Sequence, residues 1–119
     1  MQVRNNLNGV FEQILFIEIL DTTNAPLTGL TWDSAGLTAS YIVTRSATAT
    51  PITLVELPSL EDGWTEGAFA EVDPVNFPGI YRFDMPDAAF QGNRQRMMLT
   101  IGGAANMQTK IEFFDLLAV

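Results

Sequence analysis

The sequence predicts an all-β protein, an antiparallel β-sandwich of about seven strands with one short crossover helix. Short segments alternate apolar and polar residues with the period of two that is typical of half-buried strands. Turn-forming residues separate these segments at intervals of roughly ten residues, and no segment has the apolar period of a long helix. A chain of 119 residues matches the commonest size of a single domain.

The position of each strand follows from the alternation of apolar and polar residues. In the segment around Ala39 and Tyr41, for example, apolar residues face one way and threonine or serine the other. Pairs of turn residues such as Gly102 and Gly103 end these segments. The predicted strands are residues 13–20, 37–44, 52–57, 68–73, 81–85, 94–101 and 107–116.

The clearest local pattern lies at residues 73–90. Pro78 and Gly79 predict a bend, since glycine can adopt backbone angles that are closed to other residues. Pro86 ends the strand that follows, and residues 87–90 favour a one-turn helix. We expect this stretch to form a bend, an inner strand and the crossover helix between the sheets.

The strand inside this stretch has two different faces. Arg82 and Asp84 alternate with large apolar residues, which predicts a charged face in solvent and an apolar face in the core. The residues of the predicted core face are Tyr81, Phe83 and Met85.

Seven short strands and a crossover helix favour an immunoglobulin-like topology. The chain has no cysteine, so the disulfide of true immunoglobulin domains is absent and the prediction concerns the architecture alone. We expect residues 13–119 to form the sandwich. Residues 1–12 are polar and form an N-terminal arm, either a frayed end or a segment that binds a partner.

Composition excludes several classes of function. The chain has 14 acidic and 6 basic residues, a formal net charge of −8, so we expect it to bind neither nucleic acid nor anionic membranes. Without cysteine or histidine it lacks thiolate ligands, the commonest metal ligand and the usual general base. The longest apolar run, residues 14–17, is too short for a signal peptide or a membrane span, and we expect a soluble protein made in a cytoplasm.

Carboxylates are the remaining candidates for chemistry. A facing pair of them would suit glycoside hydrolysis, but each candidate borders a strand, where surface charge is the commoner role. We therefore predict that the protein is not an enzyme. The candidates are Glu56, Glu61, Glu66 and Glu71.

Carboxylates would also suit calcium, but the ligand spacing of a calcium loop is missing. Asp84, on an outward strand position, and Asp87, at a helix start, already have structural explanations. We predict no metal site and no cofactor. The acidic residues that could bind calcium are Asp73, Asp84, Asp87 and the pair Glu61 and Asp62.

Two features suggest binding of other molecules. Trp32 and Trp64 lie in predicted loops, where they either contact glycans or plug the open ends of the sandwich. The first and last strands carry large apolar residues on both faces, which need cover from residues 1–12 or from another protein. The predicted partner interface consists of Ile14, Phe16, Phe114 and Leu116.

Several loop motifs resemble a small immunoglobulin-like domain of structural proteins in tailed bacteriophages. The resemblance covers about residues 13–117 and has no motif for catalysis. The matching motifs are P-x-T-G-L-T at residues 26–31, A-x-Y at 39–41, G-x-F-x-E-V-D at 67–73 and P-G-x-Y-x-x-D-x-P-D-A-A-F at 78–90.

The resemblance implies a virion protein without enzymatic activity, located in the capsid, tail, baseplate or fibre. Family members often lie inside longer fibre or tail proteins, and a freestanding domain suits a decoration or adaptor subunit. The implied partners are major capsid or tail proteins, with many copies or a homo-oligomer in the assembly. The alternative is a carbohydrate- or host-surface-binding module of a tail or fibre.

Overall fold

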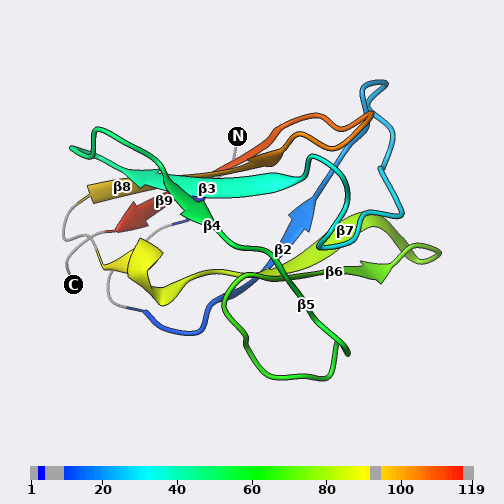
Figure 1. Cartoon of the computed structure of the whole chain (residues 1–119), viewed down its shortest axis with the longest axis horizontal. Helices are drawn as coiled ribbons and strands as arrows, with labels where there is room; N and C mark the ends of the chain where they lie inside the picture. The colour runs from blue at the N-terminus through cyan, green and yellow to red at the C-terminus, as the bar shows by residue number, and fades with distance from the viewer. Residues whose placement is uncertain (1–2, 5–9, 92–94, 117–119) are drawn as a thin grey trace.

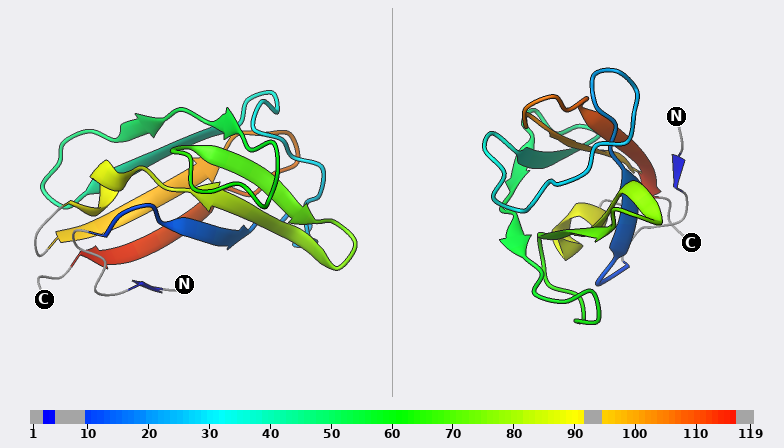
Figure 2. Two further views of the ribbon diagram at one scale, coloured as in Figure 1. Left: turned by 90° about the horizontal axis from the view of Figure 1, so that it is seen from below. Right: turned by 90° about the vertical axis from the view of Figure 1, so that its right-hand side faces the viewer.

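The computed structural model describes residues 3–4, 10–91 and 95–116, and it confirms an all-β fold. Two sheets, both mainly antiparallel, pack face to face as a β-sandwich (Figure 1 and Figure 2). No α-helix forms among the described residues. A 3-10 helix of one turn, η1 (Asp87–Phe90), lies in the connection between the two sheets.

The larger sheet has five strands. All neighbours in it are antiparallel except the two at one edge, which run parallel. Its order is β1 (Val3–Arg4), β9 (Lys110–Leu116), β8 (Gln95–Gly102), β3 (Thr38–Val43) and β4 (Thr50–Ile52).

The smaller sheet has four strands. Its neighbouring strands are antiparallel except for one pair at an edge of the sheet, which runs parallel. The order is β2 (Ile14–Glu18), β7 (Phe77–Asp84), β6 (Ala68–Asp73) and β5 (Val55–Glu56).

Strand β1 belongs to the predicted N-terminal arm. It pairs with β9, so this part of the arm extends the larger sheet. Residues 1–2 and 5–9 of the arm lie outside the described residues, as do residues 92–94 and 117–119 of the predicted sandwich.

The strand predicted at residues 52–57 is instead two short strands in different sheets. Ile52 ends β4, and Val55 begins β5 after two residues without strand pairing. The N–H of Val55 donates to the carbonyl oxygen of Gly67 at 3.0 Å, which starts the parallel pairing with β6. Alternation along the chain cannot reveal this change of sheet, because the apolar side chains face the same core from either sheet.

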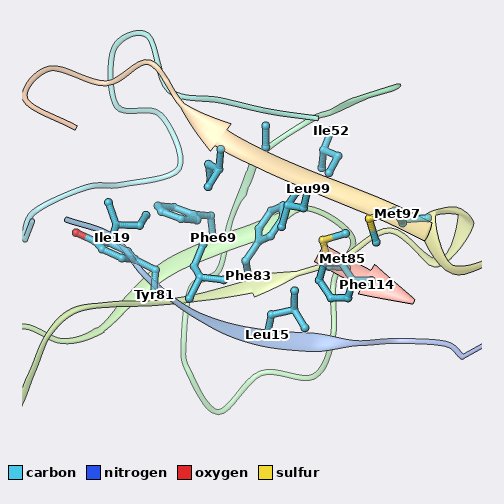
Figure 3. Packing of buried hydrophobic residues seen from close by; sticks show 14 of the residues in the cluster. Leu15, Ile19, Ile52, Phe69, Tyr81, Phe83, Met85, Met97, Leu99 and Phe114 are labelled. Atoms are coloured by element: carbon cyan, nitrogen blue, oxygen red, sulfur yellow. The ribbon is translucent and has the colours of Figure 1, made fainter. Parts of the chain in front are cut away.

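The core lies between the sheets and contains several aromatic rings in contact with one another (Figure 3). Phe69 and Tyr81 stack with their centroids 5.0 Å apart, and Phe83 meets Phe69 edge-on at 6.4 Å. The η1 turn adds Phe90, whose ring meets Phe114 edge-on at 5.6 Å. The predicted core residues of β7 and its end, Tyr81, Phe83 and Met85, are buried, whereas Tyr41 on β3 is only partly buried. Alternation also places the following buried residues on inward positions of their strands: Leu15, Ile17, Ile19, Met97, Leu99 and Ile101.

Pro78 and Gly79 lie within β7, not in a bend before it. Gly79 has a φ of 82°, and its carbonyl oxygen accepts the Ile19 N–H at 2.8 Å. A Cβ at this position would lie 2.9 Å from the Cβ of Pro26. Glycine is therefore needed here for its backbone angle and for the close approach of the loop that follows β2.

Candidate partner-binding surface

Two large apolar side chains point outward from β2, as the sequence predicts. Ile14 is 40% exposed and Phe16 is 60% exposed, whereas Leu15 and Ile17 are buried. The strand lies at the end of the four-stranded sheet and pairs with β7. Both side chains therefore keep a large part of their surface open to solvent and form an exposed apolar surface.

Phe16 also borders a shallow hollow of about 390 Å³ on the outer face of the four-stranded sheet. All four side chains that line it are apolar, and they come from β2, β6 and β7. Sequence reasoning missed three of them. The signal that could have revealed the hollow is Phe77, because a large apolar residue beside Pro78 is unexpected in the turn that the sequence predicts there. We name this hollow the Phe16 groove; its lining residues are Phe16, Val72, Phe77 and Ile80.

The charge beside the Phe16 groove is negative. Glu18 lies directly opposite Ile80 in the β2–β7 register, is exposed, and has no ion pair with any described residue. The four strands of this sheet contain one basic residue, Arg82, and five acidic residues. The five are Glu18, Glu56, Glu71, Asp73 and Asp84.

The predicted exposure of Arg82 and Asp84 is wrong. Both side chains point outward from β7, but they are buried and joined by an ion pair of 2.9 Å. The loop at residues 58–66 folds over them and supplies carbonyl oxygens to the guanidinium. The hydrogen bond to Asp84 raises the pKa of Arg82. The three carbonyl acceptors belong to Leu60, Asp62 and Gly63.

The predicted exposure of Phe114 and Leu116 is also wrong. Both are fully buried in the core, so neither contributes to an open interface. The outward apolar residues of β9 are Ile111, which is 46% exposed, and Phe113. The strand carries apolar residues on both faces, and a shift of one residue exchanges the two sets. Alternation alone therefore could not decide which set forms the core.

A second apolar hollow, of about 340 Å³, lies on the five-stranded sheet. Ile42, Met98 and Phe113 stand side by side across β3, β8 and β9, because Ile42 pairs with Met98 and Met98 with Phe113. Arg45 and Arg96 also line this hollow, and none of the described residues that line it is acidic. We name it the Phe113 hollow. Ile42, Met98 and Phe113 are apolar residues on outward positions of their strands, and this departure from alternation is the signal in the sequence that could have revealed the hollow.

The two tryptophans do not share a site. The Trp64 Nε1–H donates to the carbonyl oxygen of Met85 at 3.0 Å, so this indole holds the end of β7 in place. Trp32 is 38% exposed and lines a separate cleft of about 400 Å³ with Glu56 and Glu71. Trp64 is not among the residues that line this cleft.

Two of the acidic residues named above as possible calcium ligands accept hydrogen bonds from nearby backbone or side-chain groups, and these bonds stabilise local structure. Both carboxylate oxygens of Asp73 accept bonds from Asn76, and these bonds hold the pKa of Asp73 below its ordinary value. The Asp87 carboxylate accepts the N–H of Glu12 at 2.6 Å. In the part of the chain that the structure describes, no group of three or more acidic side chains is arranged to hold a metal ion.

None of the helices within the described ranges is long and apolar enough to cross a membrane. Comparison of the chain with protein-family models, with curated proteins and with solved structures gave no significant match. Evidence on function therefore comes from the surfaces of the molecule itself.

Proposed function

We propose that the chain is a non-enzymatic structural subunit of a tailed-bacteriophage virion. In this role it is an immunoglobulin-like domain that docks onto neighbouring capsid or tail subunits. The docking surface is the Phe16 groove together with Ile14 on the same face.

The strand order supports the immunoglobulin-like part of this proposal. In an immunoglobulin domain, strands B, E and D lie in one sheet and G, F and C in the other. The neighbours β2, β7 and β6 correspond to the first set, and β9, β8 and β3 to the second. The η1 turn then lies between the equivalents of strands E and F, as expected for a crossover between sheets.

One observation carries the docking role: an apolar groove lies open on an acidic domain. Phe16 is 60% exposed and Phe77 is 59% exposed, and both line the groove together with two further apolar residues. Large apolar surface at one location marks an interaction site more often than it serves stability. The negative charge of the rest of the molecule would keep unattached copies from aggregating.

The test is attachment of purified protein to virions that were produced without this subunit. Phe16→Glu places a charge in the groove and should abolish co-sedimentation with the particles. Leu60→Glu is the matched control, because Leu60 is 44% exposed and lies outside the groove. If Phe16→Glu protein is folded and still binds the particles as the wild type does, the groove is not the docking surface.

A second candidate function, binding of host glycans, is favoured by the cleft beside Trp32. An indole face next to carboxylates matches the stacking and hydrogen bonds by which proteins hold sugars. Glu71 already accepts the Gly29 N–H at 3.2 Å, which leaves Glu56 as the free hydrogen-bonding group. Trp32→Ala should remove binding on a glycan array, and Trp64→Phe should retain it. Equal binding by the wild type and Trp32→Ala would exclude this candidate.

A further inference from the structure

The sandwich has an apolar hollow on each of its two outer faces. The Phe16 groove lies on the four-stranded sheet and the Phe113 hollow on the five-stranded sheet. Each is formed by side chains from neighbouring strands, so each is a fixed part of the fold. The two sheets pack against each other through their inner faces, and the two hollows therefore point in opposite directions.

The two faces also differ in charge. On the outer face of the four-stranded sheet, Arg82 and Asp84 form an ion pair. Glu18, which points outward from β2 on the same side as Phe16, has no ion pair with any described residue. On the outer face of the five-stranded sheet, Asp115 pairs with Arg96, which lines the Phe113 hollow. The Lys110–Glu112 pair lies on the inner side of β9.

The charges nearest the two hollows follow the same division. Glu18 is exposed beside the Phe16 groove, opposite Ile80. Arg45 is exposed, lines the Phe113 hollow, and has no ion pair with any described residue. Each apolar hollow therefore carries an unpaired charge of opposite sign at its border.

We propose that the chain assembles head to tail, with the Phe16 groove of one copy packed on the Phe113 hollow of the next. This inference rests on the proposed function, because it takes the Phe16 groove as a docking surface and places a second copy of this chain on it. In a head-to-tail row the groove of the copy at one end stays free, and that groove would attach to the capsid or tail. The contact would bury apolar side chains on both copies and bring Glu18 of one copy towards Arg45 of the next. The surfaces differ, so the contact is heterologous and repeats into a ring or a filament.

Charge disfavours the symmetric alternatives. Two Phe16 grooves in contact would bring Glu18 of both copies together, and two Phe113 hollows would do the same with Arg45. Like charges opposed across an interface cost free energy and suppress the wrong pairing. The head-to-tail contact is the arrangement in which both hollows are covered and the charges at their borders are opposite.

The test uses two variants that each destroy one hollow. Phe16→Glu inactivates the groove and Met98→Glu inactivates the Phe113 hollow. Sedimentation velocity should show the wild type associating beyond a dimer as its concentration rises towards about 1 mM, the effective concentration of subunits held on a common scaffold. Each variant alone should remain a monomer. An equimolar mixture should form a one-to-one dimer, because one intact groove and one intact hollow remain.

Other results overturn the inference. A wild type that stays monomeric throughout this range contradicts it. Self-association of Met98→Glu alone would indicate a symmetric contact between grooves, and a mixture that stays monomeric would show that the two hollows do not meet. Leu60→Glu, which alters neither hollow, should associate as the wild type does.

A charge exchange tests the pairing of the two hollows separately. Glu18→Arg should weaken association of the chain with itself, and adding Arg45→Glu in the same chain should restore it. Absence of any rescue contradicts the predicted pairing. These measurements need no virion, so they separate the two proposals. Loss of particle attachment in Phe16→Glu with a wild type that is always monomeric retains the proposed function and removes the head-to-tail contact.

Discussion

Arg82 and Asp84, two residues apart on β7, form a two-point ion pair on the outer side of the four-stranded sheet. Arg82 Nε lies 2.9 Å from Asp84 Oδ1, and Arg82 Nη2 lies 3.0 Å from Asp84 Oδ2. Asp84 Oδ2 also accepts the Thr65 N–H at 2.9 Å, while the guanidinium donates to three loop carbonyls. The pair therefore ties the loop between β5 and β6 to the sheet.

Replacement of Asp84 by Asn should destabilise the protein by about 3–5 kcal/mol, because it leaves a buried guanidinium without its counter-charge. The free energy of unfolding, measured by urea denaturation, checks this. The matched control is Asp115→Asn. It breaks the 2.7 Å pair with Arg96, whose side chain is 58% exposed, and such a surface pair contributes at most about 1 kcal/mol. Equal losses in the two variants would contradict the structural role of the buried pair.

This ion pair also marks the limit of what the sequence could predict. Alternation correctly assigned Tyr81 and Phe83 to the core and Arg82 to the outer face, because neighbouring residues of a strand point to opposite sides. It could not show that a loop some twenty residues earlier folds over that outer face. Cover of this kind depends on contacts between distant parts of the chain, which leave no period in the sequence.

The docking surface was predictable to a similar extent. Ile14 and Phe16 were found because an apolar residue on the outer face of a strand contradicts the expected pattern. Phe114 was misassigned because β9 is apolar on both faces, so its two registers are equally consistent with alternation. The partners of Phe16 in the groove come from β6 and β7, and their proximity depends on the pairing of strands.

Gly79→Ala should destabilise the protein more than Gly29→Ala does, and the difference in the free energy of unfolding should be about 1–3 kcal/mol. Both glycines have positive φ, of 82° and 87°, so alanine costs about 1–2 kcal/mol at either position. At Gly79 the new Cβ would also lie 2.9 Å from Pro26 and 3.0 Å from the Ile19 carbonyl oxygen, whereas Gly29 has no heavy atom within 4 Å. Urea midpoints measure the difference, and equal losses would indicate that the loop at Pro26 yields freely.

Stability should fall at high pH because of Tyr81. Burial raises the pKa of this phenol to about 12 from its ordinary 10.0, and the hydroxyl donates to the Leu27 carbonyl oxygen at 2.7 Å. The folded state thus keeps a proton that the unfolded state loses, so the contribution is complete below pH 10 and is lost as the pH rises through the folded pKa. The expected slope between these values is about 1.4 kcal/mol per pH unit at most.

Urea denaturation across this pH range measures that slope. Tyr81→Phe should remove most of it and lower stability at neutral pH, because the Leu27 carbonyl oxygen loses its donor. Tyr41→Phe is the control and should retain the slope, since Tyr81 is still present. A wild type whose stability is constant over the range would refute this role of the buried phenol.

Substitution by alanine should lower the stability of the protein strongly at Phe114 and hardly at all at Phe16. Phe114→Ala removes a fully buried ring that packs edge-on against Phe90, so it should cost about 3–5 kcal/mol in the free energy of unfolding. Phe16→Ala trims a ring that is 60% exposed, and stability should change by no more than about 0.5 kcal/mol. Particle attachment and self-association should nevertheless weaken in Phe16→Ala, because the groove loses its largest exposed aromatic ring. A large loss of stability in Phe16→Ala would mean that this side chain belongs to the core, and the groove could then no longer be regarded as a surface held open for a partner.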